Sequence, residues 1–239
     1  MEIFNSTGLN LDKSPVLLIT KSIGSLIVTS DVAIDDLLDE QISVEVEKST
    51  GNLEITKGNM SLKDFILLTT FNGDAVTSDV NFKTTAECEI CEGGAIHLDE
   101  KDVIKVRLTG LNPLNKYILN GIEAPQTSLA VLSLENKSMA ADEKSKTFDV
   151  YDSDLCLLDS DDSIEEVAYT FLNDVVVKYT LHELKVLSRS VDPVAYVKND
   201  GTLKSSFAGK LQLPLIGVKN IEVRKTQGTV INLVIRKEA

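Results

Sequence analysis

The sequence predicts an all-β fold of two tandem eight-stranded jelly-roll sandwiches, each carrying one short helix (a double jelly roll). Short runs of alternating apolar and polar residues recur between turn residues along most of the chain, as half-buried strands require. Helical periodicity is confined to two places, whereas a parallel βαβ architecture would need helices between most strands. One strand–turn–strand–helix pattern also occurs twice, which indicates related tandem domains.

The repeated pattern occupies residues 42–71 and again residues 164–190. In the first copy, valines alternate with glutamates, a Ser-Thr-Gly-Asn turn follows, and a second short strand resumes the alternation. The second copy repeats this order around a Leu-Asn-Asp turn. Each copy then enters a helix, expected over Leu62–Thr70 and Leu181–Arg189.

The starts of the two helices correspond most closely. Ser61 and Asp64 stand at the N-cap and N3 positions of the first helix, and Thr180 and Glu183 do so in the second. This spacing is an acidic variant of the capping box, in which the two residues satisfy each other's backbone N–H groups. The offset between the copies is constant along the caps and the apolar residues behind them, as a duplication predicts.

The expected domains are an N-terminal jelly roll over residues 1–135, a linker over residues 136–146, and a C-terminal jelly roll over residues 147–239. The linker is polar and poor in β-formers. Residues 1–14 are expected as an arm or first edge strand, and residues 31–40 as an acidic connector. The other expected strands are 16–20, 26–29, 42–47, 53–55, 82–91, 95–98, 103–108, 117–123, 129–134, 148–158, 164–171, 175–177, 194–197, 207–213, 221–224 and 230–236.

The chain carries a net charge of −13, which argues against wrapping of nucleic acid, because that binding depends on neutralising phosphates. Residues 1–135 carry 10 basic and 21 acidic groups, whereas residues 167–239 carry 11 and 6. This contrast is either ordinary surface variation or the basis of a head-to-tail contact between unlike domains. No secretory signal is expected, and the most apolar early run, residues 16–28, is too short to span a membrane.

Cys88 and Cys91 form a C-x-x-C pair, followed by His97. A structural zinc site needs about four ligands, and the remaining candidates, Cys156 and His182, lie in the other half of the chain. Redox pairs of this form stand at a helix start, whereas this pair lies in an expected strand. Ordinary strand cysteines are therefore the favoured interpretation.

The acidic run from Asp149 to Glu166 is the one candidate metal site, with Asp159, Asp161 and Asp162 as the candidate calcium ligands. It lacks the order of an EF-hand loop and its turn glycine, so a solvated loop is the favoured interpretation and the calcium site is the alternative. No other cofactor is expected.

No catalytic constellation is visible in the sequence. It contains two histidines, far apart, and no nucleophile elbow, phosphate loop or dinucleotide fingerprint. Aromatic residues make up 5% of the chain and tryptophan is absent, which disfavours sugar binding by ring stacking. The protein is expected not to be an enzyme.

The layout resembles the double-jelly-roll major capsid proteins of icosahedral, membrane-containing bacteriophages, the corticovirus-like kind in particular. The resemblance is carried by residues 42–71, residues 164–190 and the closing hairpin over residues 220–236, about a third of the chain. Two features depart from that family. The chain is short for it, and the second jelly roll has to form from only about 93 residues.

The resemblance implies a homotrimer whose six similar lobes form a pseudo-hexameric block of an icosahedral virion shell over an internal membrane. The implied partners are neighbouring capsomers and minor capsid or membrane proteins, with peripheral contact to the internal membrane and no direct binding of nucleic acid. Two alternatives stay open. One is a non-enzymatic binding module, such as a virion spike or vertex protein or a cell-surface adhesion domain. The other is a metal-dependent jelly-roll enzyme, which the scarcity of histidines argues against.

Overall fold

The computed structural model describes the chain except residues 71–74, 129, 191–194, 205–206 and 239. The described chain forms two compact units. Unit 1 comprises residues 1–134 and 194–204, and unit 2 comprises residues 135–193 and 205–238. Strands dominate both units, and the helical elements of the described residues are two short α-helices and one 3₁₀ turn. The all-β class predicted from the sequence is confirmed.

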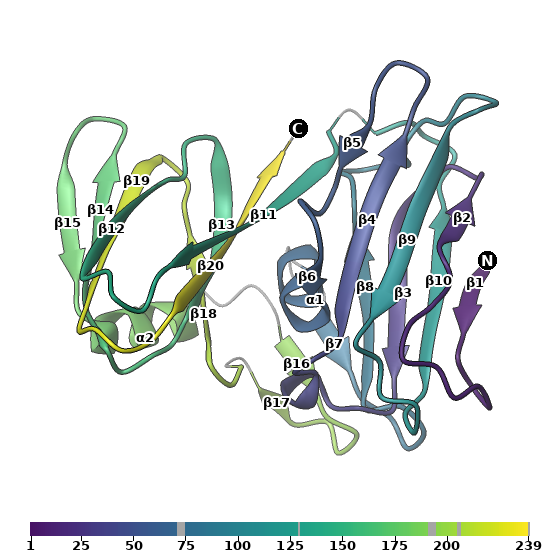
Figure 1. Ribbon diagram of the computed structural model, residues 1–239, viewed down its shortest axis with the longest axis horizontal. Helices are drawn as coiled ribbons and strands as arrows, with labels where there is room; N and C mark the ends of the chain where they lie inside the picture. The colour runs from purple at the N-terminus through teal and green to yellow at the C-terminus, as the bar shows by residue number, and fades with distance from the viewer. Residues whose placement is uncertain (71–74, 129, 191–194, 205–206, 239) are drawn as a thin grey trace. The chain divides into compact units, whose positions relative to one another are not determined.

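Unit 1 holds two sheets (Figure 1). The larger has the order β1-β10-β3-β8-β7-β16-β17, and the smaller has the order β2-β9-β4-β5, with β6 paired to β4. Its elements are β1 (Glu2–Asn5), β2 (Leu17–Ile19), β3 (Ile23–Ser30), η1 (Ile34–Asp36), β4 (Gln41–Glu47), β5 (Leu53–Glu54), β6 (Met60–Ser61), α1 (Leu62–Thr69), β7 (Ala75–Thr77), β8 (Thr84–Glu89), β9 (Val103–Thr109), β10 (Tyr117–Glu123), β16 (Ala195–Val197) and β17 (Leu203–Lys204).

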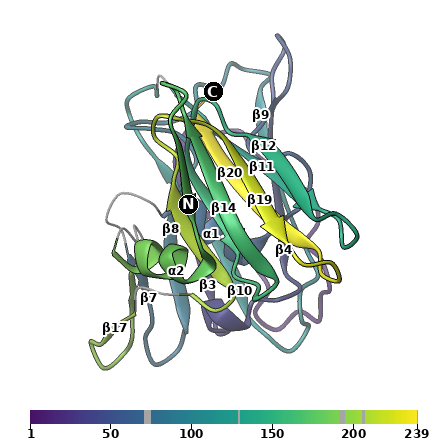
Figure 2. The same cartoon turned by 90° about the vertical axis from the view of Figure 1, so that its left-hand side faces the viewer.

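Unit 2 is a sandwich of two four-stranded sheets, β11-β20-β13-β18 and β12-β19-β14-β15, with α2 at one end (Figures 1 and 2). Its elements are β11 (Leu132–Met139), β12 (Ser145–Asp149), β13 (Ser153–Asp159), β14 (Ile164–Phe171), β15 (Val176–Tyr179), α2 (Leu181–Ser190), β18 (Lys210–Pro214), β19 (Val218–Lys225) and β20 (Ile231–Glu238).

The strands form where alternation gives one apolar face. In β4, the side chains of Ile42, Val44 and Val46 are fully buried, while the residues between them stay partly exposed. Burying one face of each sheet against the other removes these side chains from water, which is the main favourable term in folding. Unit 2 builds its core in the same way, with Val167, Ile221 and similar residues pointing between its sheets.

The two units share one strand topology. Numbered in chain order, the eight sandwich strands of unit 1 are β1 to β5 and β8 to β10, and those of unit 2 are β11 to β15 and β18 to β20. In both units one sheet has the order first-eighth-third-sixth, and the other has the order second-seventh-fourth-fifth. A helix lies between the fifth and sixth strands in each. The predicted double jelly roll is therefore confirmed, and the repeated segments lie at equivalent places in the two sandwiches.

The predicted linker, residues 136–146, needs correction, since it holds the end of β11 and the start of β12. Both are outer strands of their sheets, and an outer strand tolerates polar residues on its exposed side. Met139 is fully buried, and Lys146 pairs with Val223 of β19. The polar composition of residues 136–146 is therefore that of edge strands and not that of a linker.

Residues 194–204 also differ from the expected division. They were assigned to the second jelly roll, but β16 and β17 extend the large sheet of unit 1. β16 pairs in parallel with β7, and the Tyr196 hydroxyl donates to the Lys83 carbonyl at 2.8 Å. The alternation in this segment predicts a strand correctly, but it carries no information about the strand's partner.

Residues 95–98 do not form the predicted strand after Gly93 and Gly94. The chain instead crosses closely over neighbouring backbone. A Cβ placed on Gly24 would lie 1.9 Å from the Gly94 carbonyl oxygen, and one on Gly94 would lie 2.6 Å from the Gln126 carbonyl oxygen. The glycines here permit close backbone packing, which a sequence pattern cannot distinguish from a hairpin turn.

Candidate functional site

The second helix begins with a reciprocal capping box. The backbone N–H of Thr180 donates to a Glu183 carboxylate oxygen at 2.7 Å, and the Glu183 N–H donates to the Thr180 hydroxyl at 3.4 Å. The bond from the Thr180 N–H, and then a 2.8 Å bond that the Thr180 hydroxyl donates to the same carboxylate, hold the pKa of Glu183 below its ordinary value, because both favour the charged carboxylate. The start of α2 is fixed by local chemistry that is readable in the sequence.

The first helix also begins at its predicted cap. The Asp64 N–H donates to the Ser61 hydroxyl at 3.4 Å, and the Leu62 N–H donates to the Glu40 carbonyl at 2.8 Å. All eight residues of α1 are buried, including Lys63 and Asp64. In α2, by contrast, Leu184 is fully buried while Val186 is 52% exposed. The two equivalent helices thus differ in how much of their surface is covered.

The three candidate calcium ligands bond to different partners. Asp159 accepts from Lys210 at 3.0 Å and from the Asn232 backbone at 2.8 Å, Asp161 accepts from the Ser163 backbone at 2.8 Å, and Asp162 accepts from Lys185 at 3.1 Å. Across the described ranges, no group of three or more His, Cys, Asp or Glu side chains is placed to hold a metal. The geometry therefore offers no assembled calcium site at these residues.

The cysteines are buried free thiols. Burial raises the pKa of Cys88 to about 12, and it also raises the pKa values of Cys91 and Cys156. Thiols with raised pKa values are poor nucleophiles and poor metal ligands, since both roles need the thiolate. His97 is exposed and contacts Asp99 at 3.3 Å. Cys88 and Cys91 of the C-x-x-C pair thus have the character of ordinary packed cysteines.

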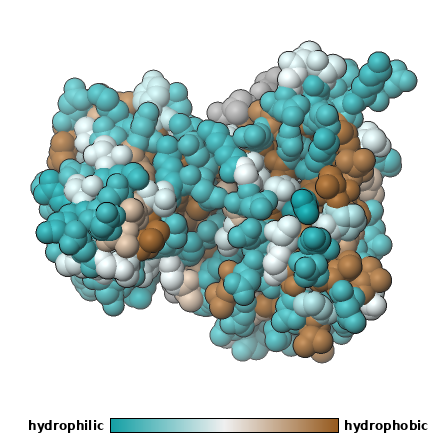
Figure 3. Space-filling view, in the orientation of Figure 1, coloured by the Kyte–Doolittle hydropathy of each residue, from teal (hydrophilic) through white to brown (hydrophobic). Residues whose placement is uncertain are grey.

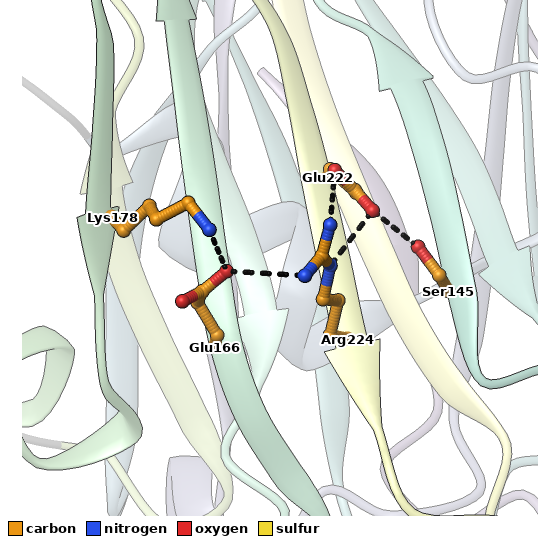
Figure 4. A network of polar contacts seen from close by, with 5 residues as sticks. All are labelled: Ser145, Glu166, Lys178, Glu222 and Arg224. Carbon is orange, nitrogen blue, oxygen red and sulfur yellow. Dashed lines mark hydrogen bonds and ion pairs between the residues drawn. The ribbon is translucent and has the colours of Figure 1, made fainter.

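A polar network crosses the outer face of the sheet β12-β19-β14-β15 (Figure 4). Glu166 accepts from Lys178 at 2.9 Å and lies 3.8 Å from Arg224. Arg224 donates to Glu222 at 2.9 Å, and Ser145 donates to the same carboxylate at 2.6 Å. Arg224 and then Ser145 hold the pKa of Glu222 below its ordinary value, because both bond to its charged form.

This network contains two carboxylates and two cations, so its formal charges cancel. It offers neither a nucleophile nor an unpaired base, and partly exposed ion pairs of this kind contribute only about 0–1 kcal/mol each. The face is best understood as a hydrophilic exterior of the sandwich. Hydrophilic residues also cover most of the face drawn in Figure 3, with apolar residues scattered between them.

The charge contrast expected from the sequence does not follow the structural division. Unit 1 carries 12 basic and 21 acidic residues, a balance of −9, and unit 2 carries 12 and 16, a balance of −4. The basic segment 167–239 shares unit 2 with the acidic strands and loops of residues 149–166, and it gives two lysines, Lys198 and Lys204, to unit 1. Both units are acidic, so charge does not favour a head-to-tail contact between them.

A cavity of about 200 Å³ in unit 2 was not foreseen from the sequence. Tyr169, Phe171 and Tyr179 form one wall, and Leu187 of α2 and Leu213 of β18 lie opposite. Three aromatic residues within the β14–β15 hairpin were the available signal, in a chain with only 5% aromatic residues. Their clustering was masked by ordinary strand alternation.

No helix among the residues that the structure describes is long and apolar enough to span a membrane. No family model matches the sequence, and no curated protein matches it.

Solved structures do match. The major capsid protein P2 from bacteriophage PM2 has a TM-score of 0.52 to this chain, over 94% of this chain and 91% of its own, at 8% sequence identity. The chain has the double-jelly-roll fold of that capsid protein. A chain from the atomic structure of Sulfolobus turreted icosahedral virus has a TM-score of 0.57, over 94% of this chain and 86% of its own, also at 8% identity. The likeness extends over both jelly rolls in each case.

Proposed function

We propose that the protein is a major capsid protein, a structural subunit whose trimers form pseudo-hexameric blocks of an icosahedral virion shell. The observation that carries this proposal is the repeated topology, in which one chain contains two sandwiches of identical strand order. Three such chains provide six similar lobes, and a closed ring of heterologous contacts uses each lobe once. The likeness to a phage major capsid protein over both lobes supports the same function.

The difference in burial between the two helices supports a ring in which neighbouring lobes contact one another. α1 and α2 occupy equivalent places, yet α1 is buried over its whole length and α2 is covered on one side. In a ring of equivalent lobes, a neighbouring copy would cover the exposed side of α2. The proposed trimer contact therefore includes the outward side of α2, with Val186 as its apolar residue.

The proposed role is non-catalytic. The described residues hold no assembled metal cluster, the buried thiols are protonated at neutral pH, and the polar network on unit 2 is internally neutral. The proposed location is the virion, over an internal membrane, with neighbouring capsomers and minor capsid or membrane proteins as partners. A net charge of −13 agrees with a shell that does not bind the genome directly.

The deciding experiment is the native mass of the purified protein by light scattering. We expect three times the 26.1 kDa of one chain. A biological trimer contact should bury more than about 1,000 Å². A stable monomer at high concentration would contradict the proposal and favour the binding-module alternative, a virion spike or vertex protein or an adhesion domain.

A matched pair of variants locates the contact. Val186 on α2 and Val230 in the β19–β20 turn are 52% and 53% exposed, so replacing either by aspartate should leave the fold intact. We expect Val186→Asp to give soluble monomers and Val230→Asp to keep the trimer. Equal behaviour of the two variants would show that α2 does not form the contact, even if the trimer exists.

A further inference from the structure

The cavity in unit 2 lies along the open side of the sandwich, between its outer strands β15 and β18. Eight residues line it, all aliphatic, aromatic or proline, and the two tyrosine hydroxyls are their only polar side-chain groups. Ile216, which is 78% exposed, stands where the cavity meets the surface. Its volume of about 200 Å³ exceeds the roughly 150 Å³ of an apolar protein cavity that stays dry and binds benzene.

The aromatic wall is preformed. The rings of Tyr169 and Tyr179 pack edge to face with centroids 5.4 Å apart, and Tyr169 stacks on Phe171 at 6.4 Å. Both spacings lie in the favourable range for aromatic pairs. A ligand would therefore meet a surface that is already ordered, which lowers the entropic cost of binding.

The equivalent sequence position in unit 1 holds a buried side chain. Tyr179 directly precedes the N-cap Thr180, and Met60 directly precedes the N-cap Ser61. Met60 is 1% exposed and packs in the core of unit 1, whereas Tyr179 is only partly buried. The duplication has kept the fold at this position, but Tyr179 of the second copy is less buried than Met60 of the first.

Tyr169 supplies a polar group that has no partner. The residue is 4% exposed, and its hydroxyl makes no hydrogen bond to any described residue. Burial raises its pKa well above the ordinary value, and Cys156 and Tyr179 nearby add to the effect. Tyr169 lines the cavity, so its hydroxyl can bond to a ligand there, and a ligand with a hydrogen-bonding group would be selected over a purely apolar one.

We propose that this cavity binds a small amphiphile, with an apolar body slightly larger than benzene and one polar group that hydrogen-bonds to the Tyr169 hydroxyl. This site is independent of the proposed capsid role, since every lining residue belongs to unit 2 of a single chain. The ligand is defined by size and by a single polar group.

The test compares p-cresol with toluene, which share a methylated ring and differ by one hydroxyl. The chain contains no tryptophan, so Ile216→Trp introduces a single fluorescent reporter at the mouth of the cavity. Leu203→Trp, at a residue 71% exposed in unit 1, is the matched control. We expect a saturable emission change with p-cresol for the first variant and none for the control. The same response in both variants, or none in either, would overturn the proposal.

Tyr169→Phe tests the polar contact. This change removes an unpartnered hydroxyl and keeps the ring, so the fold should be retained. In the wild-type chain, p-cresol should bind about tenfold more tightly than toluene, as measured by ligand-induced rises in melting temperature. We expect Tyr169→Phe to bind toluene unchanged and to lose that preference. A preference that survives the substitution would show that Tyr169 does not anchor the ligand.

Discussion

Removing the N-cap hydroxyl from each of the equivalent helices should have unequal consequences. In Thr180→Ala, the Glu183 N–H loses a long bond of 3.4 Å and the Glu183 carboxylate loses its 2.8 Å bond from the Thr180 hydroxyl, both at an exposed helix start where water can replace them. The Glu183 carboxylate keeps its 2.7 Å bond from the backbone N–H of residue 180. We expect a loss of about 0.5–1 kcal/mol, the lower part of the range for N-cap substitutions.

In Ser61→Ala, the same bond is lost in a buried helix. Water cannot readily take the place of the Ser61 hydroxyl as acceptor for the Asp64 N–H, because Asp64 is 5% exposed and all of α1 is buried. A buried donor left without a partner costs about 1–3 kcal/mol. We therefore expect Ser61→Ala to destabilise unit 1 by about twice as much as Thr180→Ala destabilises unit 2.

The assay is urea unfolding followed by far-ultraviolet circular dichroism, with free energies taken from the midpoints and slopes. Ser61→Thr and Thr180→Ser serve as controls, since both retain the capping oxygen. A larger loss for Thr180→Ala, or no loss for either variant, would show that burial of the helix start does not set the energy of the cap.

Three further predictions concern single groups. Tyr117→Phe should lower the free energy of unfolding in urea by about 1.5–3 kcal/mol, because the Tyr117 hydroxyl donates to the buried Glu40 carboxylate at 2.5 Å. A loss below about 0.5 kcal/mol, the size of a surface change, would contradict this. Burial first, and then the bond to Glu40, raise the pKa of Tyr117 to about 12 from 10.0, and burial raises that of Cys88 to about 12 from 9.0. Both groups therefore stay protonated in the folded chain after the unfolded chain has released its protons. The free energy of unfolding should be at its maximum below about pH 9 and should fall as the pH rises to 12. Tyr117→Phe should flatten this fall above about pH 10. A free energy of unfolding that rises between pH 9 and pH 12 would refute the raised pKa values of these two groups. Finally, EDTA should leave the melting temperature unchanged, since Asp159, Asp161 and Asp162 bond to separate partners, and a fall reversed by calcium would restore the calcium site.

The local features of the fold were readable from the sequence. The two helices begin after Ser61 and Thr180, where the cap spacing predicts them, because N-cap bonds join residues only three apart. The strand alternation of β4 and β9 likewise depends on neighbours two residues apart, and it predicts which side chains are buried. These signals do not depend on where the rest of the chain lies.

The partners of these elements were not readable. Asp159 bonds to Asn232, which lies 73 residues further along the chain, so the sequence could not show that this carboxylate of the acidic run has a distant partner. The parallel pairing of β16 with β7 joins residues 120 apart. Both depend on the folded arrangement, and a single sequence gives no measure of which distant residues meet.

The functional inference rests on what the duplication preserved and what it changed. Strand order is identical in the two units, which a ring of six similar lobes requires, while the helices have diverged. α1 is buried on every side, but the exposed residues of α2 are His182, Glu183, Val186 and Arg189. A neighbouring copy that covers α2 must therefore meet a mostly polar surface around Val186. Glu183 and Arg189 are charged, so part of the contact should be electrostatic and should weaken with salt. Raising ionic strength from 0.1 M to 1 M shortens the Debye length from about 10 Å to about 3 Å. The trimer should therefore dissociate at a higher protein concentration in 1 M salt than in 0.1 M salt. A trimer whose dissociation is independent of salt would show that the charged side chains of α2 take no part in the contact.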